Sequence, residues 1–520
     1  MNKKIFAPLL VLTTVYNSLT QNKIYILLAF ISLSINAQNF NQKTIKIKPP
    51  LKKSITLALL STSIISNAQT FNPKTITLPK DVTVEDLSFL KEEIQDAQVV
   101  MLGEGSHFDG NMFEMKTKVI KYLYQEMGFK TMAFESGIYD VWKAQQEINA
   151  GENVKKAFLK SLFSIWTKTN EFQRFIQFYE TNKTDLKLFG FDNQLMRIYS
   201  NDELVNDLYA FCTQNNIPLK LNKNDFQLLI EALYNYVFDD EDIAYNEYKK
   251  ALTTVINKIE KKPKTETHFY WSQIIKSLLA LGEHAYAKKE PVLSTYSSSS
   301  DDNTRDKQMA DNLLAYMQTH PNEKIICWGA NVHFVNDMSS VNTSVIKDFI
   351  PMGSYIKSVL KEKVYSLATL NASEEFCFDN MCEKTPIDPA SFENYLKQKG
   401  APHLFISSNQ PEMKKVQLNR LFSPVTFIES RLDLLHDGYI YLNEPKLSTK
   451  ASIDDKDNIK IDNVSSNKVP LISKQEVSNN DDYNKNLPAG TVTLNEVVLY
   501  GKSTANQIIF PITGNISCGR

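Results

Sequence analysis

The chain has 520 residues, of which 42% are apolar and 22% are charged, and this composition is typical of a soluble globular protein with a sizeable core. Its length allows one large domain with appendages, or two or three domains. The formal net charge of −1 gives no reason to expect nucleic acid or an acidic membrane surface as a partner. Because the sequence holds only 7 histidines, two of them in matching contexts are informative.

The first 68 residues have the pattern of an export leader. Two apolar runs, 24–38 and 54–69, each follow a basic residue and end in Asn-Ala-Gln, which is the layout of a secretory signal peptide. Both runs are shorter than the roughly 20 apolar residues that a membrane-spanning helix needs. The similarity between 35–48 and 66–79 indicates a duplicated leader. We expect an exported protein, periplasmic or extracellular, whose mature chain starts near Gln69 and has no stable membrane span.

Alternating strand and helix patterns follow the leader. An apolar run at 97–102, an amphipathic helix over 109–128 and a second apolar run at 129–135 have the length of a βαβ crossover. Further strands are expected at 184–192, 323–334 and 363–370, with helices at 170–182 and 305–320. The sequence therefore predicts an α/β fold with a mostly parallel central sheet flanked by helices.

Changes in composition divide the chain further. We expect the main domain to span 79–446 and to carry an inserted helical subdomain at 200–292, where four segments each show an apolar stripe on a polar body. Residues 447–490 are polar and poor in aromatics, which predicts a disordered linker. The segment 491–520 has the pattern of one or two strands, and its role is open.

Cys377 and Cys382 flank an Asp379-Asn380 pair that predicts a hairpin turn. Export would allow a disulfide between them, and two buried free thiols are the alternative. The cysteines and histidines lack the spacing of a zinc site.

Histidine and carboxylate side chains follow the expected strands. Glu104 and His107 follow the first strand, Glu135 ends the second, Asp192 ends the third and His333 follows the fourth. Because ligands of open α/β sheets bind at the carboxyl ends of the strands, we expect these residues to converge on one cleft. The remaining histidines lack such partners and are interpreted as structural.

This set of residues suits hydrolysis. A neutral imidazole can deprotonate water while a neighbouring carboxylate fixes its tautomer. The same residues could also bind a divalent metal. Asp192 either contributes to the site or caps a helix, and Arg305 either binds an anionic group or pairs with an acid. No GxSxG, HExxH or Walker motif is present in the sequence.

The motifs "GEGSHF", "FEMKTKVIKYLYQEMGFKTMAFE", "RDKQMADNLL" and "KIICWGANVHF" occur in this order, and with them the chain resembles the erythromycin esterase family over about residues 85–445. The resemblance implies that His107 is the general base in hydrolysis of a macrolide lactone, without an obligatory metal. It also implies site roles for Glu104, Glu135 and His333. Lys116 stands where the family usually has an arginine, so the two-pronged grip of a guanidinium is lost.

We therefore expect a hydrolase that cleaves a small-molecule carboxylic ester or lactone with water. In this interpretation Glu104 orients His107, Glu135 positions the water, and His333 with Lys116 or Arg305 stabilises the oxyanion, while Asp192 lies at the substrate. No cofactor is expected, although a divalent metal stays open. The alternatives are a metal-dependent hydrolase of amide or peptide bonds and a non-catalytic binding protein of the cell envelope.

Overall fold

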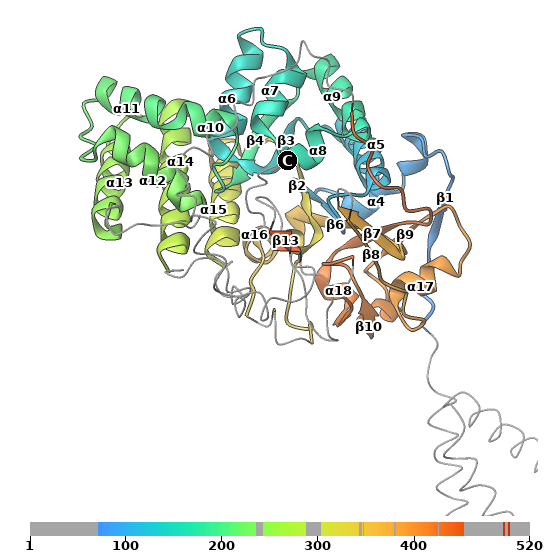
Figure 1. Cartoon of the computed structure of the whole chain (residues 1–520). Helices are drawn as coiled ribbons and strands as arrows, with labels where there is room; N and C mark the ends of the chain where they lie inside the picture. Colours follow the sequence, from blue (N-terminus) through green and yellow to red (C-terminus); the bar gives the residue numbers. More distant parts are fainter. Residues whose placement is uncertain are drawn as a thin grey trace, which may run out of the picture. The chain divides into compact units, whose positions relative to one another are not determined.

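An eight-stranded sheet forms the centre of the computed structural model of the chain (Figure 1). Its strand order is β1-β9-β12-β6-β2-β5-β3-β4. The strands from β12 to β4 pair in parallel, whereas β9 is antiparallel to both β12 and β1. The expected mostly parallel sheet is confirmed. The strands are β1 (Ile76–Leu78), β2 (Val99–Glu104), β3 (Thr131–Gly137), β4 (Lys187–Asp192), β5 (Ile325–Ala330), β6 (Val364–Asn371), β9 (His403–Ser407) and β12 (Gly438–Leu442).

The structure describes residues 71–235, 243–287, 303–342, 346, 348–378, 381–424 and 426–451, together with the short strands β13 (Val492–Thr493) and β14 (Val498–Leu499). The chain divides into two units, 1–70 and 71–520, and all described residues belong to the second. The expected export leader and most of the expected linker lie outside the described residues. The expectation of disorder is wrong for residues 447–451, because their backbone bonds to the residues around Asp109 and Thr169. β13 and β14 pair antiparallel, in agreement with the strands expected after residue 491.

Helices cover both faces of the sheet (Figure 1). The α-helices are α4 (Leu90–Ile94), α5 (Gly110–Met127), α6 (Ile138–Asn149), α7 (Val154–Ser161), α8 (Ser164–Thr167), α9 (Asn170–Asn182), α10 (Ile198–Asp202), α11 (Leu204–Gln214), α12 (Lys223–Asn235), α13 (Tyr245–Ile259), α14 (Glu266–Ala287), α15 (Asn303–Thr319), α16 (Met352–Leu360), α17 (Phe392–Lys397) and α18 (Leu432–Leu435). The 3-10 helices are η1 (Glu85–Leu87), η2 (Asn331–Phe334), η3 (Lys361–Lys363) and η4 (Pro411–Lys414).

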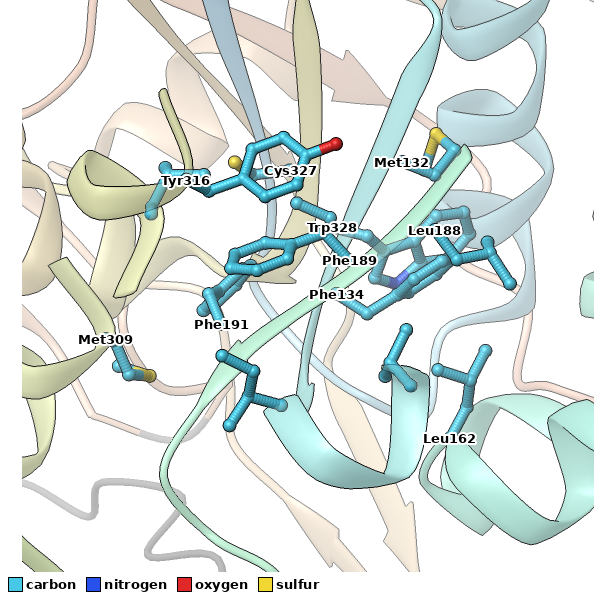
Figure 2. Packing of buried hydrophobic residues seen from close by; sticks show 14 of the residues in the cluster. Met132, Phe134, Leu162, Leu188, Phe189, Phe191, Met309, Tyr316, Cys327 and Trp328 are labelled. Carbon is cyan, nitrogen blue, oxygen red and sulfur yellow. The ribbon is translucent and has the colours of Figure 1, made fainter. Parts of the chain in front are cut away.

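The core consists of two layers on opposite faces of the sheet. Phe134 of β3 lies in register with Trp328 of β5, and both rings pack against Phe172 of α9. Because successive strand residues point to opposite faces, Cys327 of β5 and Phe189 of β4, which both pair with Ala133 of β3, lie on the other face. There Tyr316 of α15 packs with its ring centre 4.4 Å from that of Phe189. Figure 2 shows both layers at the centre of the sheet.

The insert between β4 and β5 is helical, as expected. Helices α11–α14 form a cluster of their own in Figure 1, and α14 packs against α6 and α15. The cluster therefore stands beside the β4 edge of the sheet and rests on the two helices that flank this strand.

Strand order decides the position of the candidate residues. The first crossover, β2-α5-β3, joins two parallel strands that are not neighbours, because β5 lies between β2 and β3. The fourth expected strand, 323–334, ends earlier, at Ala330, and continues as the 3-10 helix η2. Residues that follow β2, β5 and β3 are thereby brought to one edge of the sheet.

The expected hairpin around residues 379–380 is present as β7 (Glu375–Phe378) and β8 (Met381–Lys384), which pair antiparallel with Cys377 opposite Cys382. The side chains of both cysteines lie outside the described residues, so the expected disulfide stays a prediction. Cys212 and Cys327 are buried free thiols.

Candidate active site

The seven residues expected from the sequence lie at the carboxyl edge of the parallel strands. Glu104 is the last residue of β2, Asp192 is the last of β4, and Glu135 lies near the end of β3. The other four come from the elements that follow strands or begin helices: His107 from the turn after β2, Lys116 from α5, Arg305 from the first turn of α15 and His333 from η2. All seven are buried except Arg305, whose side chain is 12% exposed.

Three of these residues share one carboxylate, and we refer to Glu104, His107 and Lys116 as the His107 group. His107 Nδ1 lies 2.7 Å from Glu104 Oε1, and Lys116 Nζ donates to Glu104 Oε2 at 2.5 Å. A carboxylate beside Nδ1 favours the tautomer that carries its hydrogen there. His107 Nε2 then presents a lone pair, and this atom is buried without a hydrogen-bond partner among the described residues.

Lys116 is fully enclosed by protein. Its Nζ lies 4.3 Å from the centre of the Trp328 ring and also donates to the Gly329 carbonyl at 3.2 Å. Burial lowers the pKa of Lys116 from 10.5 to about 8, although the charge of Glu104 partly opposes this shift. The lysine is therefore charged at neutral pH and loses its proton in mildly alkaline solution.

The other four expected residues form the Arg305 group: Glu135, Asp192, Arg305 and His333. The Arg305 guanidinium donates to both oxygens of Asp192, at 3.1 and 2.6 Å, and to Glu135 Oε1 at 3.1 Å. Of the two sequence interpretations of Arg305, pairing with acids is thus the one observed. Asp192 contacts the backbone amide of Gln194 and Arg305, so it belongs to this ion-pair network.

His333 lies between two carboxylates. Its Nδ1 is 2.9 Å from Asp306 Oδ1, and its Nε2 is 3.3 Å from Glu135 Oε1. Burial opposes its charge, but Asp306 and Glu135 together raise the pKa of His333 to about 10. This direction favours the imidazolium form of His333 at neutral pH. Arg305 Nη1 also lies 3.2 Å from His333 Nε2, and its charge opposes the rise in the His333 pKa.

Both Arg305 and His333 contact the carboxylate of Glu135. Burial raises the pKa of Glu135, but His333 and Arg305 outweigh it and hold that pKa well below its usual range. Its Oε2 accepts from the Ala330 amide at 2.8 Å. A Cβ on Gly329 would lie 2.8 Å from this oxygen, so glycine there permits the close approach of β5 to Glu135.

The end of β5 connects the two groups. Lys116 donates to the carbonyl of Gly329, and the next residue, Ala330, donates its amide to Glu135. Glu104, His107, Glu135 and His333 thus lie at one edge of the sheet, as expected, whereas the cleft expected there stays a prediction.

Two residues of the site were missed in the sequence. Asp306 holds His333 and also accepts from the Met352 amide at 2.8 Å; its signal was its position directly after Arg305 in "RDKQMADN". Trp166 of α8 donates from Nε1 to Glu104 Oε1 at 2.7 Å, and its ring lies edge-on to His107 at 6.0 Å. No local pattern marks Trp166, because it reaches the site from a four-residue helix that only tertiary packing places there.

The described residues contain no set of three or more His, Cys, Asp and Glu side chains placed to hold a metal ion. Asp192, Glu135 and His333 all contact the Arg305 guanidinium. A permanent cation thus lies where these residues come together.

A sequence model of the family described as erythromycin esterase matches residues 124–441. The chain belongs to the erythromycin esterase family. The matched span contains the whole Arg305 group, whereas the His107 group lies before it. The His107 group nevertheless contacts residues of the matched span, Trp166 and Gly329. This membership supports a hydrolase of the erythromycin esterase type.

Relatives agree with this assignment. "Putative hydrolase YbfO" of Bacillus subtilis (strain 168) is 27% identical over 399 residues, which cover 69% of this chain and 86% of that protein. A crystal structure of a Bacillus cereus protein has a TM-score of 0.59 at 16% identity, covering 75% of this chain and 99% of the other. A mutant of the erythromycin esterase EreC in its open conformation has a TM-score of 0.54 at 17% identity, covering 73% of this chain and 99% of the other. At such identities the two structures show a shared fold.

None of the helices in the described part of this erythromycin esterase family member combines the length and apolar character that crossing a bilayer requires.

Proposed function

We propose that the protein hydrolyses a carboxylic ester or lactone with His107 as the general base. The observation that carries this proposal is the buried Nε2 of His107, which has no protein partner among the described residues while Nδ1 is bound to Glu104. A lone pair held in this way is placed to accept a proton from water. Lys116 and Trp166 hold the same carboxylate and keep Glu104 oriented.

In the proposed reaction a water gives its proton to His107 Nε2, and the resulting hydroxide attacks the ester carbonyl carbon. The carbonyl oxygen becomes an oxyanion, and when the carbon–oxygen bond breaks, the leaving alkoxide takes the proton back from His107. Glu135 can accept a hydrogen bond from the attacking water, because a carboxylate has about four lone-pair sites and three protein groups contact Glu135.

Arg305 is the proposed oxyanion donor. Its Nε and Nη2 bind carboxylates, whereas its Nη1 contacts only His333 Nε2 among the described residues. Because Nη1 carries two hydrogens and has this one contact, at least one hydrogen stays available to the substrate. His333 then supports the oxyanion by its charge, and Lys116 acts on Glu104 instead.

A macrolide lactone is the first substrate to test, because EreC, which shares the fold, is an erythromycin esterase by name. Its hydrolysis would make the protein part of a response to antibiotic. Lys116 supplies one ammonium in place of the expected guanidinium, so simpler esters belong in the same substrate panel.

We also propose that this chemistry needs no metal. Arg305 binds the carboxylates of Asp192 and Glu135 and supplies the positive charge that a metal would bring to this cluster. A metal-dependent hydrolase of amide bonds is the competing proposal, and treatment with a chelator separates the two.

The test is an ester and lactone panel with the wild-type protein, His107→Ala and His268→Ala, each with and without chelator. His268, in the helical insert, binds Thr265 and Asn215 and serves as the matched control. Loss of a general base should lower the rate about 10²–10⁴-fold in His107→Ala only. Full activity of His107→Ala would refute the mechanism, and loss on chelation with recovery on adding Mn²⁺ or Zn²⁺ would favour the metal enzyme. Tight ligand binding without turnover by the wild type would favour the binding protein.

A further inference from the structure

After β12 the chain runs past the turns that follow β2 and α8 as a segment, Glu444–Ala451, which we name the C-terminal strap. The strap first pairs with the residues directly after His107. Ser448 donates its amide to the Phe108 carbonyl at 2.8 Å, and Gly110 donates its amide to the Lys446 carbonyl at 2.7 Å. These two bonds form an antiparallel bridge between Asp109 and Leu447.

The same strap then pairs with the residues just after α8, the helix that carries Trp166. Asn170 donates its amide to the Thr449 carbonyl at 2.8 Å, and Ala451 donates its amide to the Lys168 carbonyl at 2.8 Å. A second antiparallel bridge, between Thr169 and Lys450, results. One short segment thus joins two turns that lie about sixty residues apart in the sequence.

Glu171, buried in the first turn of α9, fixes the middle of the strap. Its two carboxylate oxygens accept from the amide and the hydroxyl of Thr449 at 2.9 and 3.0 Å. A Cβ on Gly110 would lie 2.7 Å from the Glu171 carboxyl carbon, so the start of α5, the start of α9 and the strap are packed without intervening space.

Each of the two turns directly follows a hydrogen-bond partner of Glu104 in the sequence. His107 and Trp166 each contact Glu104 Oε1 at 2.7 Å, and the strap bonds begin one residue after His107 and two residues after Trp166. A helix of four residues such as α8 has little stability of its own. Its position therefore depends on what its ends are bonded to.

We propose that the C-terminal strap is a positioning element that sets the geometry of His107 and Trp166 around Glu104. The strap lies beyond residue 441, where the family match ends, so it is a feature of this chain outside the matched region. Its effect on catalysis rests on the proposed function, but its effect on the two turns does not.

The experiment measures amide hydrogen exchange of the full chain by mass spectrometry, together with kcat and KM on the best ester of the panel. Ser448→Pro and Ala451→Pro each remove one amide donor of the strap. Lys397→Ala is the control, because Lys397 of α17 forms a surface ion pair with Glu374 and lies outside the strap and the two turns.

In each proline variant, exchange in the peptides over 105–112 and 164–170 should rise about tenfold or more, while strands β3 and β4 stay protected. kcat should fall about 10- to 100-fold at little-changed KM, and the control should behave as the wild type. Unchanged exchange in both peptides would overturn the proposal, and so would a rise that includes β3 and β4, because the strap would then stabilise the whole domain. If the wild type hydrolyses no ester, the proposed function fails while the exchange result still decides the role of the strap.

Discussion

Lys116 Nζ lies 2.5 Å from Glu104 Oε2, on the carboxylate whose other oxygen binds His107 at 2.7 Å. The ammonium and the imidazole therefore depend on one buried carboxylate. An arginine would keep its charge at every pH that a folded protein tolerates, whereas burial brings the pKa of Lys116 down from 10.5 to about 8. This difference makes the geometry of the site sensitive to mildly alkaline pH.

We predict that kcat/KM of the wild type falls as the pH rises through about 8, because Lys116 then loses the charge that holds Glu104. In Lys116→Arg this alkaline decline in kcat/KM should move to higher pH by at least about one pH unit, since a guanidinium keeps its proton up to about pH 12. A pH–rate profile of both proteins from pH 6 to 10 checks this, provided that both stay folded by circular dichroism. If kcat/KM declined at the same pH in both proteins, the decline would come from the titration of another group.

The second prediction concerns Asp306, which raises the pKa of His333 to about 10 together with Glu135. Removing its charge in Asp306→Asn should bring that pKa down, so activity at pH 7 should fall about tenfold or more and recover partly at lower pH. The pH–rate profile is the measurement. Asp311→Asn, on the same helix and paired with the exposed Lys307, should leave the profile unchanged.

The raised pKa of His333 also predicts how the free energy of unfolding changes with pH. A histidine whose pKa is higher in the folded state stabilises the fold fully below its unfolded pKa of about 6.5, and this stabilisation is lost as the pH rises toward 10. We therefore expect the difference in unfolding free energy between wild type and Asp306→Asn to be largest below pH 6.5 and to shrink between pH 6.5 and 10, as measured by urea denaturation. A difference that grows over this range would contradict the assignment.

Trp166→Phe removes one donor from Glu104 and keeps the aromatic ring. Hydrogen bonds to charged groups contribute about 1.5–3 kcal/mol, so we expect a loss of that size in unfolding free energy and a several-fold lower kcat. Trp142→Phe is the matched control, because Trp142 stacks on Tyr270 and does not contact the site. Equal effects of the two substitutions would mean that Trp166 acts through packing alone.

The last prediction concerns export, which rests on residues outside the described part of the chain. When the full chain is expressed in a secreting host, N-terminal sequencing of the mature protein should begin at Gln69, after the second Asn-Ala pair. A mature chain that begins near Gln38 would show that the first leader is used, and a chain that keeps Met1 would refute export.

Local patterns were sufficient to predict most of the elements that carry the site. The apolar run before Glu104, the stripe of α5 and the helix with Arg305 all appear in the structure close to their expected bounds. The reason is that side-chain periodicity, which decides strand or helix, is a property of neighbouring residues. Likewise, the rule that loops converge at the carboxyl ends of parallel strands was sufficient to predict that His107 and His333 lie at one edge of the sheet.

The tertiary structure alone decided which partner each side chain has. Placing β5 between β2 and β3 puts His333 beside Glu135 and lets Lys116 reach Gly329. The protonation of His333 follows from Asp306, and the orientation of Glu104 follows from Trp166, which approach from α15 and α8. Such contacts depend on strand order and helix packing over long sequence separations, and a pKa depends on the charges that these contacts bring together. The sequence by itself therefore determined the residue types of a hydrolytic site, while the fold determined which of them accepts, donates or carries charge.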